Sequence, residues 1–426
     1  MFPKARAIPA CRSYVTRLQV ASLVAFSLTP ISPTIQNHKS HTWKSQDFGI
    51  HLAAYRLAAA ERADSLLKQL EDQLRSGDKR AAAKSVQQFL QSSGDNPKSR
   101  SALGMLFAQH GYYSEAAAQF NEAHKQAPQD YDISYNLALA LYRGKEYQRA
   151  TEVLKQAIAR QDRAELHSLL ADVYEGAGQF LEAAHEYEKA VDLDPQNESN
   201  WFDLAYDMLR HRTYDGALST LIPAVGRFPR SFRLRLSLGA AYFGRRQIEE
   251  AVQSFLEATN LDPRSEIGYR FLGAACSLRG SYGKEVAERF KTFSALQPAN
   301  PWGYYLYGLA LQEGSLGLAR NQEKVAELYR RAISLSPNFA EAHERLGETY
   351  ARQGKLGEAV GQFESAIALR KDWSDPHYQL ARAYVRLGEK TKAQTEFELQ
   401  RKLQAAEQSK VNQRIHQIDM FIIMLR

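Results

Sequence analysis

Cysteine is nearly absent from this chain. Its 426 residues include only Cys11 and Cys276, which excludes a small fold held together by several disulfides. Cys276 lies in a segment whose apolar residues have helical spacing, so we expect it to be a small buried core residue.

Signatures of catalysis and of metal binding are also missing. The sequence has no H-E-x-x-H motif, no phosphate-binding G-K-[ST] loop and no G-x-S-x-G nucleophile turn. Its eleven histidines are scattered, and we find none spaced with Cys, Asp or Glu as metal ligands usually are. We therefore predict no catalytic residue, no metal site and no cofactor, and we expect that the protein is not an enzyme.

Acidic residues are lacking at the start of the chain. The first is Asp47, and the basic residues before it are Lys4, Arg6, Arg12, Arg17, Lys39 and Lys44. These six account for most of the formal charge of +7 and leave the remaining sequence nearly neutral. Nucleic-acid binding normally requires a basic surface, so no nucleic-acid partner is expected.

No long hydrophobic run is present. The apolar stretch Leu18–Leu28 is too short for a stable membrane span. Residues 1–33 are basic, then apolar, then broken by prolines, which is typical of a signal peptide, and residues 34–55 form a linker. We therefore expect export to a periplasmic or extracellular location. The acid-free start also suits a mitochondrial transit peptide, and a cytoplasmic protein with a disordered extension is the third possibility.

The sequence is rich in one feature, an apolar pattern that recurs about every 34 residues. The pattern returns nine times from Lys98 onward. Its clearest copy consists of Leu103, Gly104, Phe107, Gly111, Tyr113, Ala116, Phe120, Ala123 and Pro128. A fixed period of this length predicts stacked helical hairpins, each too small to bury its apolar face alone.

Each copy divides into two amphipathic helices, A and B, which are joined by a turn. A glycine that can adopt the left-handed conformation ends helix A at Gly111, Gly178, Gly280, Gly354 and Gly388. Small residues twelve apart, such as Gly104 with Ala116 and Gly239 with Ala251, are expected where the two helices cross. An aromatic on helix B is expected to fill the gap to the next hairpin, and a proline then ends the helix.

These residues resemble the tetratricopeptide repeat family, whose signature is W-x2-L-G-x2-Y, G-x-Y, A-x3-F-x2-A and P. The resemblance covers nine units: 97–130, 131–163, 164–197, 198–231, 232–265, 266–300, 301–339, 340–373 and 374–407. It implies an all-α, right-handed superhelical solenoid whose A helices line a concave groove. It also implies that the groove binds a peptide or protein.

Three segments depart from the regular pattern. Residues 56–96 form a weaker helical pair that we expect to cap the array. The seventh unit carries extra residues at 313–320, which form either a functional edge or a tolerated surface loop. The apolar C-terminal helix at 408–426 either caps the ninth unit or contacts a partner or a second copy of the chain.

The family resemblance also assigns side chains to the groove. The predicted partner-binding residues are Tyr135, Tyr142, Phe202, Tyr206, Arg210, Arg233, Phe243, Arg270, Trp302 and Tyr305. From the fourth to the sixth unit, the groove positions hold aromatic residues and arginines without an acidic residue among them. Such side chains are common interface anchors. The alternative is that several of them pack between neighbouring A helices.

The sequence therefore predicts a non-catalytic scaffold that binds an extended polypeptide or a partner protein. One alternative is an accessory arm of an enzyme or of a secretion or envelope assembly. Another is an envelope protein that binds glycans, since grooves lined by aromatic residues also suit sugars.

The leader gives a first testable prediction. If residues 1–33 are a signal peptide, the mature protein isolated from its native host should begin beyond Leu28. N-terminal sequencing measures this directly. Recovery of Met1 or Phe2 from a soluble cytoplasmic fraction would contradict export.

Overall fold

The computed structural model describes residues 61–279, 282–313, 322–409 and 424–425. The predicted leader and linker, Gly280, almost all of the insertion at 313–320 and most of the segment 408–426 lie outside the described residues. The helices are α2 (Glu61–Ser76), α3 (Lys79–Ser93), α4 (Pro97–Gln109), α5 (Tyr113–Gln126), α6 (Tyr131–Arg143), α7 (Tyr147–Arg160), α8 (Ala164–Gly176), α9 (Phe180–Leu193), α10 (Glu198–Arg210), α11 (Tyr214–Arg227), α12 (Phe232–Gly244), α13 (Ile248–Leu261), α14 (Glu266–Arg279), α15 (Lys284–Leu296), α16 (Pro301–Glu313), α17 (Gln322–Leu335), α18 (Ala340–Arg352), α19 (Leu356–Leu369), α20 (Ser374–Leu387) and α21 (Lys390–Ser409).

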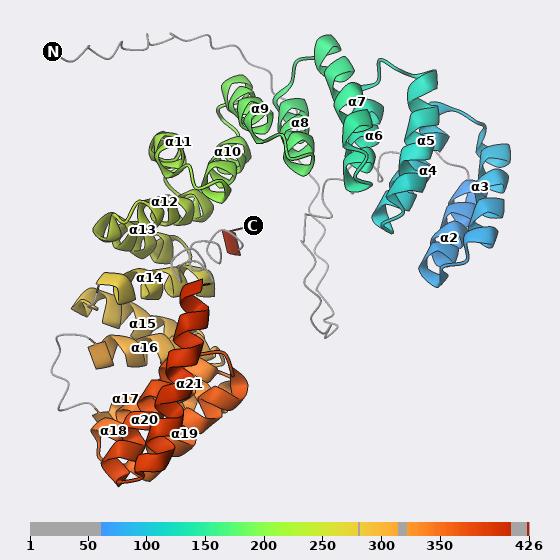
Figure 1. Cartoon of the computed structure of the whole chain (residues 1–426). Coiled ribbons are helices and arrows are strands. Elements are labelled where there is room, and N and C mark those ends of the chain that lie inside the picture. The colour runs from blue at the N-terminus through green and yellow to red at the C-terminus, as the bar shows by residue number, and fades with distance from the viewer. Residues whose placement is uncertain (1–60, 280–281, 314–321, 410–423, 426) are drawn as a thin grey trace, which may run out of the picture. The chain divides into compact units, whose positions relative to one another are not determined.

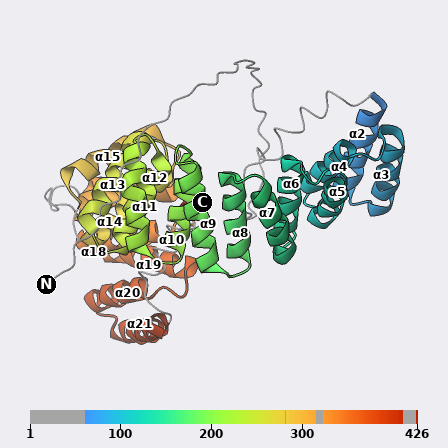
Figure 2. The same cartoon turned by 90° about the horizontal axis from the view of Figure 1, so that it is seen from above.

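The described residues form helices and connecting turns, with no strand among them. Consecutive helices pack against each other in pairs, and each pair packs against the next (Figures 1 and 2). The expected all-α solenoid of helical hairpins is therefore confirmed. Among the helices that the structure describes, none has the length and apolar character that crossing a bilayer requires.

A close contact between a small residue and a ring joins the two helices of a hairpin. A Cβ atom added to Gly104 of α4 would lie 2.9 Å from ring atoms of Phe120 on α5. A Cβ at Gly347 of α18 would lie 2.6 Å from Phe363 on α19, and one at Gly239 of α12 would meet Phe255 on α13. The ring thus lies over the glycine of its own hairpin, a contact that the expected crossing of Gly104 with Ala116 did not include.

The same rings also reach the following hairpin, as expected. Phe255 is fully buried, and its ring centroid lies 5.5 Å from that of Phe271 on α14 in an edge-to-face arrangement. The seventh hairpin keeps the contact in spite of its extra residues, since a Cβ at Gly308 would lie 2.6 Å from Tyr329. The insertion therefore does not remove the contact between glycine and ring that joins α16 to α17.

Cys276 is fully buried, as predicted, and this burial raises the pKa of its thiol to about 12.

Turns and helix ends follow local rules. Gly111, Gly178, Gly354 and Gly388 have φ between +77° and +81°, which confirms the predicted left-handed turns. Helix B ends two residues before each of the five predicted prolines, which are Pro128, Pro195, Pro229, Pro263 and Pro337. Three other turns place residues with a side chain in the left-handed region, namely Lys145, Arg212 and Arg246, at φ of 62°, 59° and 64°.

At the C-terminal end, only Met424 and Leu425 of the predicted apolar segment are described. Leu425 is 8% exposed and belongs to the core cluster that extends from Phe202 to Leu346. This cluster contains no residue of α20 or α21. The expectation that this segment packs on the ninth hairpin is therefore wrong for the two described residues.

The glycine contact predicts opposite effects for two Gly→Ala substitutions. Gly239→Ala should destabilise the protein by about 1–3 kcal/mol, because the new methyl group would overlap the Phe255 ring. A Cβ atom added to Gly361 of α19 would meet no atom within 4 Å, so Gly361→Ala should stabilise by about 0.5–1 kcal/mol through helix propensity. Urea denaturation of both variants measures the difference. Equal stability of Gly239→Ala and the native chain would disprove the contact.

Candidate partner-binding surface

The A helices of neighbouring hairpins form one layer. Besides its own partner, α10 contacts α8 and α12, and α14 contacts α12 and α16. Further along the chain, α18 contacts α20 in the same way. Side chains on adjacent A helices can therefore act together on one ligand, as the family resemblance implies.

The structure buries three of the ten predicted binding residues. Phe202, Phe243 and Tyr305 are 4%, 3% and 8% exposed, because they pack between helices. The expectation that these three rings line an open groove is therefore not met, and the alternative of packing between A helices holds for them. The other seven keep exposed or half-buried side chains: Tyr135, Tyr142, Tyr206, Arg210, Arg233, Arg270 and Trp302.

Two groups of predicted residues come together. The guanidinium of Arg233 lies 4.4 Å from the ring centroid of Phe202, which stacks on Tyr206 at 5.9 Å. The guanidinium of Arg270 lies 4.3 Å from the ring centroid of Trp302 on α16. In contrast, the ring of Tyr142 packs beside Tyr147 of its own hairpin, with centroids 6.2 Å apart.

The three predicted arginines have acidic partners. Arg210 Nη1 lies 2.7 Å from Glu175 Oε2, Arg233 Nη2 lies 3.3 Å from Glu198 Oε1, and Arg270 Nη1 lies 3.2 Å from Glu266 Oε1. No acidic residue was predicted among the groove positions of these units, and acidic residues were expected to flank them; the three glutamates are such flanking partners. Glu198 and Glu266 are the first residues of α10 and α14, and Glu175 lies at a groove position of the preceding, third unit.

A cleft between α18 and α20 was not predicted. It has a volume of about 150 Å³ and is lined by Glu348, Ala351, Arg352, Gln379, Arg382, Ala383 and Arg386. The three arginines are exposed, and within the described residues none of them has a carboxylate partner. Arg386 Nη1 donates a hydrogen bond to the carbonyl oxygen of Ala351 at 2.6 Å, and Arg382 lies over the ring of Tyr378.

A sequence signal for this cleft did exist. Arg382 lies two positions after Leu380, and Arg386 lies one helical turn further, which are the positions assigned to the groove in earlier units. Arg352 is the equivalent residue of the eighth unit. The predicted binding residues end at Tyr305 in the seventh unit, so they did not include these arginines of the eighth and ninth units.

Hydrogen bonds hold the acidic residue of this cleft in place. Glu348 Oε1 accepts a hydrogen bond from Gln379 Nε2 at 3.1 Å, and Glu348 Oε2 accepts from Gln312 Nε2 at 3.2 Å and from Arg345 Nη1 at 3.1 Å. These bonds connect α16, α18 and α20. Since both carboxylate oxygens of Glu348 are engaged, the cleft offers mainly guanidinium donors to a ligand.

Some histidines do have acidic neighbours, which the sequence analysis missed. His167 contacts Glu186 and Asp162, and His377 Nδ1 lies 2.6 Å from Glu396 Oε2. His211 contacts Glu175 and is four residues from Asp207 on the same helix face. The prediction that no histidine is spaced with acids is therefore wrong, because an i, i+4 pair was present in the sequence.

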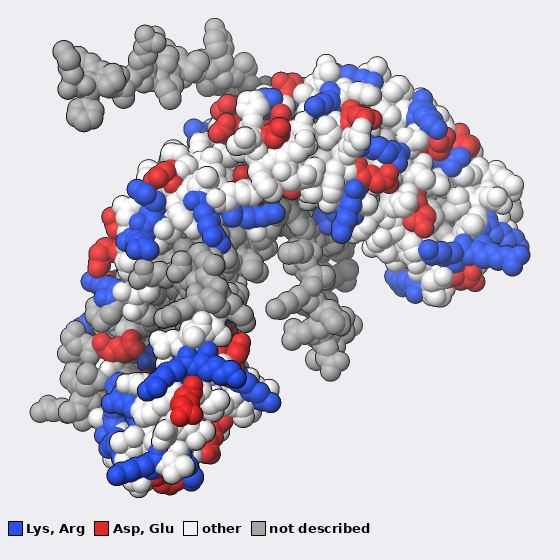
Figure 3. Space-filling view, viewed as in Figure 1, with Lys and Arg blue, Asp and Glu red and all other residues white. Residues whose placement is uncertain are grey.

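Charge is mixed over the surface. Basic and acidic side chains lie interspersed on the face drawn in Figure 3. This distribution agrees with the nearly neutral composition beyond the leader. A surface of mixed charge favours recognition of a ligand through individual ion pairs over attraction of the ligand by a field of one sign.

The hairpins of short antiparallel helices define a helical-repeat protein, and sequence comparison identifies its family. Three family models described as tetratricopeptide repeat match the chain. One matches residues 107–173, one matches residues 164–197, and one matches both residues 67–131 and residues 202–266. A fourth model, described as TPR repeat, matches residues 322–354. The chain belongs to the tetratricopeptide repeat family. No curated protein sequence matched the chain.

Several solved structures are similar. The C-terminal part of a TPR repeat-containing protein from Cytophaga hutchinsonii is 15% identical with a TM-score of 0.45, over 65% of this chain and 98% of that one. MamA is 18% identical with a TM-score of 0.35, over 39% of this chain and 92% of that one. Yeast Tom70 is 14% identical with a TM-score of 0.36, over 85% of this chain and 96% of that one.

Glu344, on the same helix as Glu348, gives a pH-dependent prediction. Burial raises the pKa of its carboxyl from 4.5 to about 8, with Arg345 opposing the shift and Glu348, Asp375 and Glu341 adding to it. The folded protein therefore favours the neutral acid, and its stability falls as the pH rises from about 4.5 through 8. Glu344→Gln should match the native melting temperature at pH 4.5 and exceed it at pH 9.

Thermal unfolding at the two pH values measures this effect. The control is Glu358→Gln, which alters an exposed glutamate on α19 and should change the melting temperature little at either pH. A Glu344→Gln variant that is no more stable than the native chain at pH 9 would show that the carboxyl is not held neutral.

Proposed function

We propose that this protein is a non-catalytic interaction scaffold that holds an extended, acidic polypeptide segment against its A helices. Membership of the tetratricopeptide repeat family supports the general role, since such arrays usually act as scaffolds. The observation that carries the specific proposal is the cleft lined by Arg352, Arg382 and Arg386. Within the described residues, these arginines have no carboxylate to neutralise them.

The chemistry of the cleft favours a carboxylate ligand. A guanidinium presents a planar fork of N–H donors that matches the two oxygens of a carboxylate. Three such groups, on two adjacent helices, surround one hollow of about 150 Å³. An Asp or Glu side chain, or a chain-terminal carboxylate, would supply the missing negative charge.

The seven predicted binding residues that keep accessible surface extend this proposal toward the earlier hairpins. Tyr206 offers a half-buried ring against which apolar side chains of a ligand can pack. Arg210, Arg233 and Arg270 are already paired with glutamates, so a ligand there must share or replace an existing ion pair. We therefore assign the main charge recognition to the arginine cleft and apolar packing to the earlier surface.

The same surface would serve an accessory arm that holds one subunit of a larger assembly. Glycan binding has less support. The ring of Trp302 has Arg270 at 4.3 Å and the Phe339 ring at 4.7 Å, so its faces are already in use. Sugar rings usually need one free aromatic face.

The test uses peptides displayed from a random 12-residue library, selected on the whole chain. We expect the selected peptides to be rich in Asp and Glu. Their affinity should fall at least about 5-fold for each change of Arg352, Arg382 or Arg386 to Gln, since one anchor contributes about 1–3 kcal/mol. Fluorescence anisotropy of a labelled peptide measures the affinity.

The control is a variant that removes three positive charges elsewhere, Arg80→Gln, Lys84→Gln and Arg401→Gln, at exposed positions outside the cleft. It should bind the peptide nearly as well as the native chain. Selection of peptides without acidic residues, or equal binding by the cleft variants, would contradict the proposal.

A further inference from the structure

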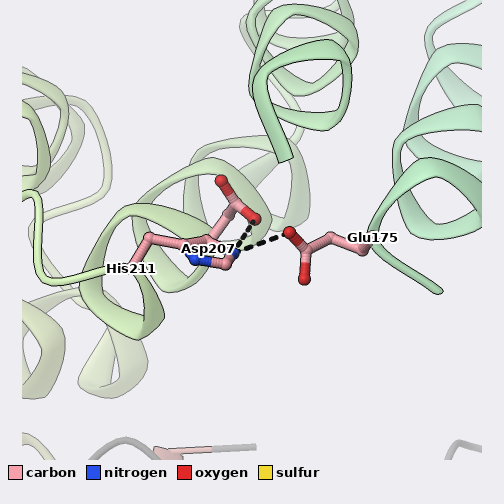
Figure 4. Close-up of side chains that lie close together, drawn as sticks. All are labelled: Glu175, Asp207 and His211. Carbon is pink, nitrogen blue, oxygen red and sulfur yellow. Dashed lines mark hydrogen bonds and ion pairs between the residues drawn. The ribbon is translucent and has the colours of Figure 1, made fainter. Parts of the chain in front are cut away.

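Three potential metal ligands meet where the third and fourth hairpins pack together. Glu175 lies in the last turn of α8, Asp207 lies on α10, and His211 directly follows α10. Figure 4 shows the three side chains directed toward one another from two A helices. Because Asp207 and His211 are four residues apart, they share one face of the helix.

The donor atoms have the spacing that one small ion requires. His211 Nε2 lies 2.7 Å from Glu175 Oε1 and 3.7 Å from Asp207 Oδ1. One donor atom from each residue lies within 4.8 Å of the other two. Zinc bonds to nitrogen and oxygen at about 2.0–2.2 Å, so tetrahedral ligands of one zinc ion are about 3.3 Å apart. Small side-chain rotations would bring all three atoms to that distance.

Burial gives an independent indication of a missing partner. Asp207 is 5% exposed, and its Oδ1 is buried without a hydrogen-bond partner in the described part of the chain. Glu175 is 8% exposed and faces the same space. Two charged carboxyl groups side by side repel each other, and a proton or a cation, such as Arg210 beside Glu175, reduces this repulsion.

The surroundings suit a bound ion. Arg210 Nη1 lies 2.7 Å from Glu175 Oε2 and so orients this carboxylate. Glu175 Oε1 contacts His211 Nε2, and an ion would bind both atoms in place of that contact. The side chain of His211 is 28% exposed, which gives an ion a path from solvent. The set of one imidazole and two carboxylates suits zinc and similar transition metals better than calcium or magnesium.

We propose that Glu175, Asp207 and His211 bind one divalent transition-metal ion, with zinc as the best match. The ligands come from α8 and α10, so the ion would hold the third and fourth hairpins together. A water molecule would complete the coordination. This inference does not rest on the proposed function, since no residue of the arginine cleft takes part.

The experiment titrates zinc chloride into the whole, tag-free chain by calorimetry after treatment with a chelator. We expect one zinc ion per chain. Affinity should fall at least 10-fold in His211→Ala and in Asp207→Asn. The control His185→Ala removes an exposed histidine that lies 4.0 Å from Glu188, and it should bind zinc like the native chain.

Cobalt absorption gives a second measurement that does not depend on calorimetry. The native chain should develop the visible bands of four- or five-coordinate cobalt, and folded Asp207→Asn should lack them. Asp207→Asn should remain folded because it removes a buried charge while keeping the shape. No zinc binding by the native chain, or equal binding and equal cobalt bands in Asp207→Asn, would overturn the proposal.

Discussion

In the hairpins α4–α5, α12–α13, α16–α17 and α18–α19, the separation of the two helices depends on a ring that lies directly on a glycine. With Gly104 under Phe120, Gly239 under Phe255 and Gly347 under Phe363, the helices approach closely enough to enclose a core. The ring that seals one hairpin also contacts the next, as Phe255 contacts Phe271. This shared contact sets how hairpins stack, and the stacking then determines which side chains of adjacent A helices can meet.

Most of the fold could be predicted from the sequence because its determinants are local. The recurrence of Leu, Gly and Phe identifies the hairpins, glycine marks the turns, and proline marks the ends of the B helices. The contact of the Phe120 ring with Gly104 was not predicted, although the pairing of Gly104 with Ala116 was. It was missed because a one-dimensional pattern records spacing but not the direction in which a large side chain points.

The candidate sites were much harder to predict, because their partners are about one repeat apart. Glu175 and His211 are separated by 36 residues, Glu198 and Arg233 by 35, and Ala351 and Arg386 by 35. A residue on one A helix meets the residue one period later on the next, so polar partners emerge only when the repeats are compared column by column. The burial of Phe202 was missed for a similar reason. A neighbouring A helix covers its ring, and hydrophobic periodicity within one helix does not contain that information.

The left-handed turns at Lys145, Arg212 and Arg246 have a consequence for the mechanics of the array. A residue with a Cβ atom is less stable in this conformation than glycine by about 1–2 kcal/mol. The hairpins α6–α7, α10–α11 and α12–α13 therefore have weaker turns than those closed by Gly111, Gly178, Gly354 or Gly388. In a linear array, local opening is governed by the stability of each unit and its neighbours. Local stability is thus distributed unevenly along the chain, and the hairpins that carry Arg210 and Arg233 are among those expected to open most readily.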